Sequence, residues 1–190
     1  LVALDGAGKL PAVDGSQLLG LGGGRLKSTK VFAVSGNYTP TSGTNFILVL
    51  GKGAGSGGNW SYAGAPGGLG ISFVSVNPAK SYQVIVGAGG YPTSGQKDTA
   101  GAGGNTYITI DGVQHGGPGA YGGGYDNDRL WPGYPGNPLA GTLFTRLFTG
   151  PLRESILLDD TAILGAARGI GGGRTKYGAN GYLVIVEFGA

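Results

Sequence analysis

The sequence predicts an all-β protein, organised as an antiparallel, β-sandwich-like domain with long glycine-rich loops. About seven short segments have the apolar patterns of β-strands, with turn residues between them. Glycine supplies 44 of the 190 residues, against roughly 7% in ordinary proteins, and it gathers between the strand patterns. The connections also alternate between short turns and long glycine-rich segments, as in a simple antiparallel sheet.

The first predicted strands flank a turn-rich connection. The segment VFAVSG (31–36) alternates between apolar and polar residues, and NYTPTSGTN (37–45) is rich in turn residues. The segment FILVL (46–50) is a continuous apolar run. Such a run is typical of a strand that is buried on both faces.

The later strands are closed by recognisable turns. NPAK (77–80) is a tight turn, and Asp111–Gly112 is a dipeptide typical of type I′ hairpins. The remaining predicted strands are Ile71–Val76, Tyr82–Val86, Asn105–Ile110, Val113–His115 and Tyr182–Phe188.

The alternation of connections predicts that the glycine-rich segments meet. Successive connections in an antiparallel order lie at opposite ends of the sheet. The short links are 36–45, 77–80 and 111–112, and the glycine-rich ones are 51–70, 87–104 and the segment from 116 on. Strict alternation would start the strand at Val31 at the glycine-rich end, unless a connection crosses the sheet or the first strand wraps around it.

The glycine content has two interpretations. The segments are either mobile loops or extended, polyproline-II-like chains, packed so closely that side chains would not fit.

Residues 1–28 differ from the rest of the chain and predict a short fibrous stem, with the β domain at 29–190. Apolar residues alternate there with turn dipeptides, and so short a segment cannot bury them by itself. They pack either on the main domain or on other copies of the chain, and we favour the second. The residues are Leu1, Leu4, Leu10, Val13, Leu18, Leu19 and Leu21.

Residues 125–165 interrupt the strand pattern. The segment 125–138 combines acids, one arginine and large aromatic residues with prolines, which predicts an ordered, irregular loop. The more apolar segment 142–165 predicts short strands or turns that reach a core or an interface between chains, through Leu143, Leu147, Ile156, Leu157, Ile163 and Leu164.

Several function classes are disfavoured. The net charge is only +3 with scattered basic residues, which argues against nucleic-acid binding. No cysteine is present, so disulfides and cysteine-zinc sites are excluded. No apolar run reaches the ~20 residues that span a bilayer, so membrane insertion is not expected.

No enzymatic, metal or cofactor site can be assembled from the sequence. The single histidine, His115, is best read as structural. The acidic pairs Asp126/Asp128 and Asp159/Asp160 lack the spacing of a calcium site and are better read as solvated turns. We therefore expect a protein that is not an enzyme and that holds neither metal nor cofactor.

Aromatic residues in the loops are the candidate binding groups. Each is either a buried anchor or part of a surface where rings stack on sugars and polar groups bind hydroxyls. An arginine among them suits an acidic or phosphorylated glycan. The candidate glycan-binding residues are Trp60, Tyr62, Tyr125, Asp126, Asn127, Arg129, Trp131 and Tyr134.

Several motifs resemble the glycine-rich, C-terminal receptor-binding domain of side tail fibre proteins from tailed bacteriophages and prophages. They are GGRLKSTKVFAVSGNYTPTSGTNFILVLGKGAGSGG, NPAKSYQVIVGAGG and GANGYLVIVEF, preceded by the repeat-like ALDGAGKLPAVDGSQL. The resemblance covers nearly the whole chain. The glycine runs are shorter than in the most glycine-rich fibre tips, and the His-x-His metal repeats of some tips are missing.

Membership of this family would imply a homotrimer at the distal end of a tail fibre in the virion. Such a tip binds lipopolysaccharide or another glycan of the host surface, has no enzymatic activity, and is often assembled with a dedicated chaperone. Two alternatives stay open. One is a structural fibre segment without receptor contact, and the other is a tailspike that degrades glycan through paired carboxylates.

Overall fold

The structure, a computed structural model, describes residues 25–60, 62–94, 98–126, 129–131, 134–137, 139–141, 144–146 and 176–189. Within these ranges every helix-or-strand element is a β-strand. The strands are β1 (Arg25–Phe32), β2 (Gly36–Tyr38), β3 (Thr44–Lys52), β4 (Leu69–Ser75), β5 (Tyr82–Ile85), β6 (Thr106–Ile110), β7 (Val113–Gly117), β8 (Ala120–Tyr121), β9 (Gly124–Asp126), β10 (Arg129–Trp131), β11 (Tyr134–Pro135), β12 (Phe144–Arg146) and β13 (Tyr182–Gly189).

Two antiparallel sheets form the body of the domain. One has the order β1-β13-β3-β4-β12, and the other has the order β2-β5-β6-β7. The strand pairs β9–β10 and β8–β11 form two smaller sheets. The predicted all-β, antiparallel fold class is therefore confirmed. The short strand β12 lies within 142–165, where short strands or turns were predicted, whereas the segment 125–138, predicted to be an irregular loop, contains strand residues of β9, β10 and β11.

The hydrophobic core lies between the two large sheets. Inward-facing residues of β3 and β13 meet those of β2, β5 and β6, because alternate residues of a strand point to opposite faces. The buried cluster comprises Tyr38, Ile47, Val49, Tyr82, Val84, Ile108, Ile110, Leu183 and Ile185.

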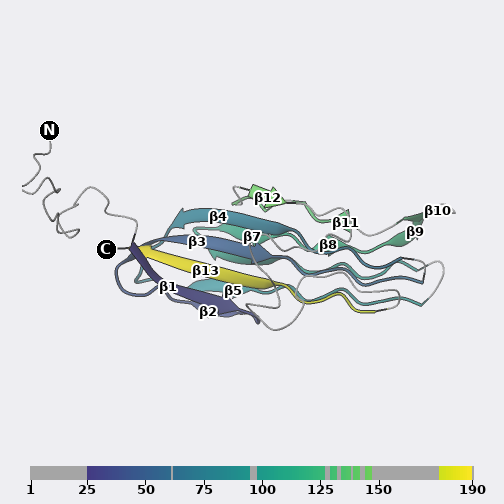
Figure 1. Cartoon of the computed structure of the whole chain (residues 1–190), viewed down its shortest axis with the longest axis horizontal. Helices are drawn as coiled ribbons and strands as arrows, with labels where there is room; N and C mark the ends of the chain where they lie inside the picture. Colours follow the sequence, from purple (N-terminus) through teal and green to yellow (C-terminus); the bar gives the residue numbers. More distant parts are fainter. Residues whose placement is uncertain are drawn as a thin grey trace, which may run out of the picture.

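The beginning of the chain differs from the prediction. Instead of one strand at 31–36, β1 runs along β13, with Arg25 opposite Gly189, and β2 returns along β5 in the other sheet. The chain thus crosses between sheets within three residues, 33–35. This crossing starts the described chain at the end of the sheets away from the glycine-rich segments (Figure 1).

The continuous apolar run in β3 was predicted to be buried on both faces of the strand, but only one face is fully buried. Ile47 and Val49 are fully buried in the core. Phe46, Leu48 and Leu50 lie on the opposite face and are partly exposed. No second layer of described residues covers that face.

The glycine-rich segments extend from one end of the sheets and lie side by side, as the alternation of connections predicted (Figure 1). Backbone hydrogen bonds between them repeat every third residue. In segment 53–58 the N–H groups of Gly53 and Ser56 donate to Gly68 and Ala65, those of Ala54 and Gly57 to Gly104 and Gly101, and those of Gly55 and Gly58 to Ala179 and Lys176.

A repeat of three residues is the geometry of polyproline II. Successive residues of segment 53–58 face three different neighbours, and the fourth residue faces the first neighbour again. None of the glycines in 53–58 has a positive φ, which also fits polyproline II. Among the described residues, ordered packing rather than mobile loops accounts for this glycine density.

Glycine is required in these segments by space. A Cβ on Gly53 would lie 1.8 Å from the carbonyl oxygen of Pro118, and one on Gly57 would lie 1.9 Å from that of Tyr91. Where Cβ fits, alanine occurs, as at the fully buried Ala54. We call segments 53–58, 62–68, 87–93, 100–104, 118–123 and 176–181 the glycine bundle.

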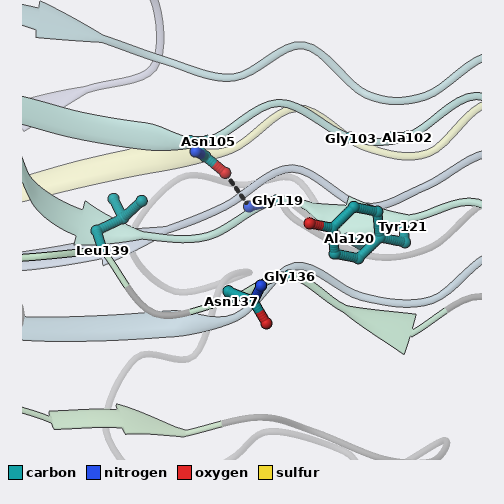
Figure 2. A pocket seen from close by; sticks show the side chains of 9 residues that line it. All are labelled: Ala102, Gly103, Asn105, Gly119, Ala120, Tyr121, Gly136, Asn137 and Leu139. Atoms are coloured by element: carbon teal, nitrogen blue, oxygen red, sulfur yellow. Dashed lines mark hydrogen bonds between the residues drawn. The ribbon is translucent and has the colours of Figure 1, made fainter.

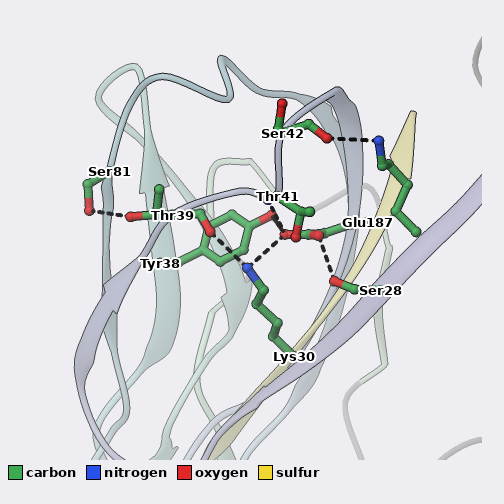
Figure 3. A network of polar contacts seen from close by, with 9 residues as sticks. Ser28, Lys30, Tyr38, Thr39, Thr41, Ser42, Ser81 and Glu187 are labelled. Atoms are coloured by element: carbon green, nitrogen blue, oxygen red, sulfur yellow. Dashed lines mark hydrogen bonds and ion pairs between the residues drawn. The ribbon is translucent and has the colours of Figure 1, made fainter. Parts of the chain in front are cut away.

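A buried carboxylate ties the first strands to the last (Figure 3). Glu187 on β13 is fully buried and accepts hydrogen bonds from the Tyr38 hydroxyl at 2.8 Å, the Ser28 hydroxyl at 2.6 Å and the Thr41 N–H at 3.1 Å. The Lys30 ammonium lies 3.1 Å from the same carboxylate. Burial alone would raise the pKa of Glu187, but these hydrogen bonds outweigh it and lower the pKa to about 2.

Candidate functional site

The candidate site lies at the end of the glycine bundle far from the sheets, which we call the distal surface. It comprises the loop 59–62, Tyr91, Tyr177 and the β9–β10 hairpin. Hydrogen bonds from Gly58 to Lys176, from Thr93 to Gly58 and from Ala100 to Gly123 mark the last connected layers of the bundle. The loop follows Gly58 and the hairpin follows Gly123, so both project beyond these layers. Figure 1 shows β9 and β10 at this end.

Trp60 and Tyr62 are held in a tight loop. The Asn59 side-chain oxygen accepts a hydrogen bond from the Tyr62 N–H at 2.6 Å, and the Asn59 N–H donates to the Tyr62 carbonyl. This closes the loop on itself and leaves 53% of Trp60 and 38% of Tyr62 exposed. These two predicted contact residues are therefore on the surface and held by a defined backbone.

The β9–β10 hairpin carries four more of the predicted residues. Arg129 pairs with Asp126, Leu130 with Tyr125, and Trp131 with Gly124. The register places Asp126 and Arg129 directly opposite each other on the two strands. Asn127, the remaining predicted residue of this segment, lies outside the described residues.

Tyr134 does not lie at the distal surface. It lies on β11, where it pairs with Tyr121 on β8. The neighbouring Ala120 donates its N–H to the Ala54 carbonyl, so this pair lies along the side of the glycine bundle. The predicted residues thus separate into a distal group and a lateral one.

The structure adds residues that the predicted set omitted. Tyr91 is 61% exposed and Tyr177 is 72% exposed. Both lie at the level of Gly57 and Gly58, because Tyr91 accepts from Gly101 and Lys176 accepts from Gly58. Both are loop aromatics next to glycine or proline in the sequence, but only the hydrogen-bonded packing of the bundle brings them to the same end as Trp60.

The exposed tyrosine and tryptophan residues lie in a different part of the domain from the buried ones. Tyr38, Tyr82 and Tyr182 are buried in the sheets. In the glycine bundle and its loops, Trp60, Tyr62, Tyr91, Tyr121 and Tyr177 are exposed. These five residues are therefore not buried anchors of their loops within one chain.

Beside Tyr121 the bundle has an open pocket of about 290 Å³ (Figure 2). Its walls are backbone of 102–103 and 119–120, with side chains of Tyr121, Asn137 and Leu139 at the rim. Asn105 spans one side and accepts a hydrogen bond from the Gly119 N–H at 2.8 Å. Tyr121, which lines this small, polar hollow, pairs through its strand with Tyr134.

The single histidine was predicted to be structural. His115 is buried, and its Nδ1 lies 2.9 Å from the Gly141 carbonyl oxygen. Burial lowers the pKa of His115, although the bond to Gly141 opposes this. No group of three or more metal-binding side chains occurs among the residues described in the structure. The acidic residues Asp128, Asp159 and Asp160 fall outside them.

No family model matches the chain, and no curated protein matches it at a significant level. Within the described ranges, no helix is long and apolar enough to cross a membrane.

Proposed function

We propose that this chain is the receptor-binding tip of a bacteriophage tail fibre, and that its distal surface binds a glycan of the host cell, with lipopolysaccharide as the first candidate. The observation that carries the proposal is the gathering of exposed aromatic residues at the end of the glycine bundle far from the two large sheets. The resemblance of the sequence motifs to fibre tips supports the same function.

The chemistry of the distal surface suits a sugar. Tyrosine and tryptophan present a flat apolar face and a polar group on the same side chain, and Trp60, Tyr62, Tyr91 and Tyr177 offer such faces. Asp126 and Arg129 add a carboxylate and a guanidinium in the neighbouring hairpin. A guanidinium binds acidic or phosphorylated sugars in a bidentate manner.

The glycine bundle supplies rigidity. Its backbone is hydrogen-bonded from the sheets to the last layer at Gly58 and Gly123. A surface held in this way loses little conformational entropy on binding. A single site would bind glycan with a dissociation constant on the order of millimolar to micromolar. Simultaneous binding by three chains and by several fibres of one virion would raise the overall avidity.

The proposal includes a homotrimer in the virion, assembled with a chaperone, with no enzymatic activity. The purified chain should bind host cells and extracted lipopolysaccharide, and its solution mass should be measured on the same sample. Absence of binding by a correctly assembled trimer would favour a structural fibre segment. Shortened glycan after incubation would instead favour a tailspike.

A further inference from the structure

The pocket beside Tyr121 lies in the flank of the glycine bundle, and we call it the lateral pocket. It is bordered by segments 102–105, 119–121 and 136–139. The Gly103 N–H donates to the Ala120 carbonyl, and the Gly136 N–H donates to the Gly119 carbonyl. The middle segment is therefore hydrogen-bonded to both of the others, as the floor of a groove is joined to its two walls.

The lateral pocket is separate from the distal surface. The Ala120 N–H donates to the Ala54 carbonyl, so the pocket lies at the level of Ala54. At 3.1 Å per residue of polyproline II, this level is about 12 Å from that of Gly58, where the distal surface begins. A ligand of one site does not occupy the other.

The three-residue repeat keeps one side of segment 100–104 open. The N–H groups of this segment donate in turn to segments 118–123 and 87–93, and the third position of the repeat faces neither. Ala102 and Asn105 take this position, are exposed and line the lateral pocket. Within the described part of the chain, no carbonyl accepts the Ala102 N–H, so this backbone donor is open to a ligand.

The polar groups of the lateral pocket are uncharged. None of the nine described residues that line it is acidic or basic. The Asn105 Oδ1 accepts the hydrogen bond from the Gly119 N–H at 2.8 Å, which fixes this amide and keeps its nitrogen as a donor. Figure 2 shows the Tyr121 hydroxyl pointing toward Gly119, with the amides of Asn105 and Asn137 on either side.

The size and the lining suit one sugar ring. The volume of about 290 Å³ lies at the lower end of ligand pockets, which hold roughly 300–1,000 Å³. Tyr121 is 41% exposed and offers an aromatic ring to the C–H face of a sugar. Sugar hydroxyls both donate and accept hydrogen bonds, as amide and backbone groups require. A charged sugar would meet no opposite charge here, and an unpaired charge is costly to desolvate.

We propose that the lateral pocket binds one uncharged sugar residue, a hexose or an N-acetylhexosamine. The class of sugar rests on the lining of the pocket, whereas its origin in the host glycan rests on the proposed function. The distal surface, which includes Arg129, suits an acidic or phosphorylated sugar. The two sites would therefore select different residues of a glycan.

The experiment follows the backbone amide signals of the full chain by NMR during titration with four uncharged probes. The probes are the methyl glycosides of glucose, galactose, mannose and N-acetylglucosamine. At least one is expected to shift the amides of 102–105, 119–121 and 136–139, with a dissociation constant on the order of millimolar. The corresponding uronate, in which a carboxylate replaces the hydroxymethyl group, should bind about tenfold more weakly.

Ala102→Leu extends a side chain into the lateral pocket and should weaken binding of the glycoside by about tenfold or more. Ala88→Leu is the matched control, because Ala88 is also an exposed alanine of the glycine bundle but does not line the pocket. It should keep the wild-type affinity. Asn137→Ala, at an exposed position, should weaken binding about three- to tenfold through one lost hydrogen bond, and it preserves the test if Ala102→Leu does not fold.

Three results would overturn the lateral site. They are no shift with any of the four glycosides, shifts confined to 59–62, 91 and 177, and wild-type affinity in both folded Ala102→Leu and folded Asn137→Ala. Shifts confined to the distal residues would leave the proposed function standing. Shifts at the lateral pocket in a chain that does not bind host cells would support the site and count against the proposed function alone.

Discussion

The Tyr38 hydroxyl donates a hydrogen bond of 2.8 Å to the Glu187 carboxylate, although 149 residues separate the two in the chain. Tyr38 belongs to the four-stranded sheet and Glu187 to the five-stranded one, so this bond joins the two layers. Burial is the main cause that raises the pKa of the Tyr38 hydroxyl, and the hydrogen bond to Glu187 raises it further. Lys30 also lies 5.0 Å from the centre of the Tyr38 ring, and a buried network of this kind is sensitive to the loss of any member.

Acid should destabilise the domain through Glu187. Its pKa falls from an ordinary 4.5 to about 2 in the folded chain, so the folded state favours the carboxylate. The stabilisation is complete above about pH 4.5 and is lost as the pH falls towards 2. At 1.36 kcal/mol for each pKa unit, it amounts to at most about 3 kcal/mol. Urea unfolding at pH 7, 4 and 2.5 measures it.

Glu187→Gln should remove most of this pH dependence and lower the free energy of unfolding at pH 7 by about 2–3 kcal/mol. Asp98→Asn, at an exposed position, is the control and should keep the wild-type profile. An unchanged pH dependence in Glu187→Gln would show that other carboxylates control the acid response.

Gly57→Ala should disrupt the glycine bundle. The added Cβ would lie 1.9 Å from the Tyr91 carbonyl oxygen, and backbone must move to admit it. We expect a loss of about 2–3 kcal/mol of stability, measured by thermal unfolding. Gly36→Ala is the matched control, because no atom lies within 4 Å of its added Cβ. Equal stability of the two variants would contradict the close packing.

Trp131→Ala should lower adsorption to host cells and leave the melting temperature of the protein unchanged. Trp131 lies on β10 in the distal hairpin, away from the core between the two large sheets. Cell binding and thermal unfolding are measured on the same preparation. Parallel losses of both would mean that Trp131 has a structural role.

Tyr177→Ala should weaken glycan binding, although Tyr177 is not among the eight candidate residues that we selected from the sequence. Loss of one aromatic contact of about 0.5–1.5 kcal/mol lowers single-site affinity roughly two- to tenfold. Val34→Ala is the control, because Val34 is exposed to a similar degree, 74% against 72%, but lies between β1 and β2. Titration calorimetry with a monovalent glycan measures the affinity of each variant. Identical affinities of the Tyr177→Ala and Val34→Ala variants would show that Tyr177 does not contact the glycan.

The strand pattern was largely predictable, because alternation, turn dipeptides and apolar runs are local signals. The Asp111–Gly112 turn is an example, with positive φ at both residues. The crossing at 33–35 was not predictable, because VFAVSG reads as one strand and only the pairing of Tyr38 with Tyr82 assigns β2 to the other sheet. For the glycine segments the sequence left mobile loops and polyproline-II packing as alternatives, since a three-residue hydrogen-bond repeat depends on neighbours distant in the sequence.

The candidate site was predictable in part. Trp60 and Tyr62 stood out by residue type and loop position, and both are exposed. Tyr91 and Tyr177 carried the same local signal, but their shared level with Gly57 and Gly58 follows only from the packing of segments 87–93 and 176–181. Tyr134 lies beside Tyr121 instead of at the distal surface, a difference that chain order does not reveal.

The most direct test of the central claim is binding of the purified full-length chain to host cells treated in two ways. Periodate oxidises sugar diols of the surface glycan, and protease removes exposed surface protein. The account predicts that periodate abolishes binding and that protease leaves it intact. Binding that survives periodate and disappears after protease would identify a protein receptor and contradict recognition of a glycan.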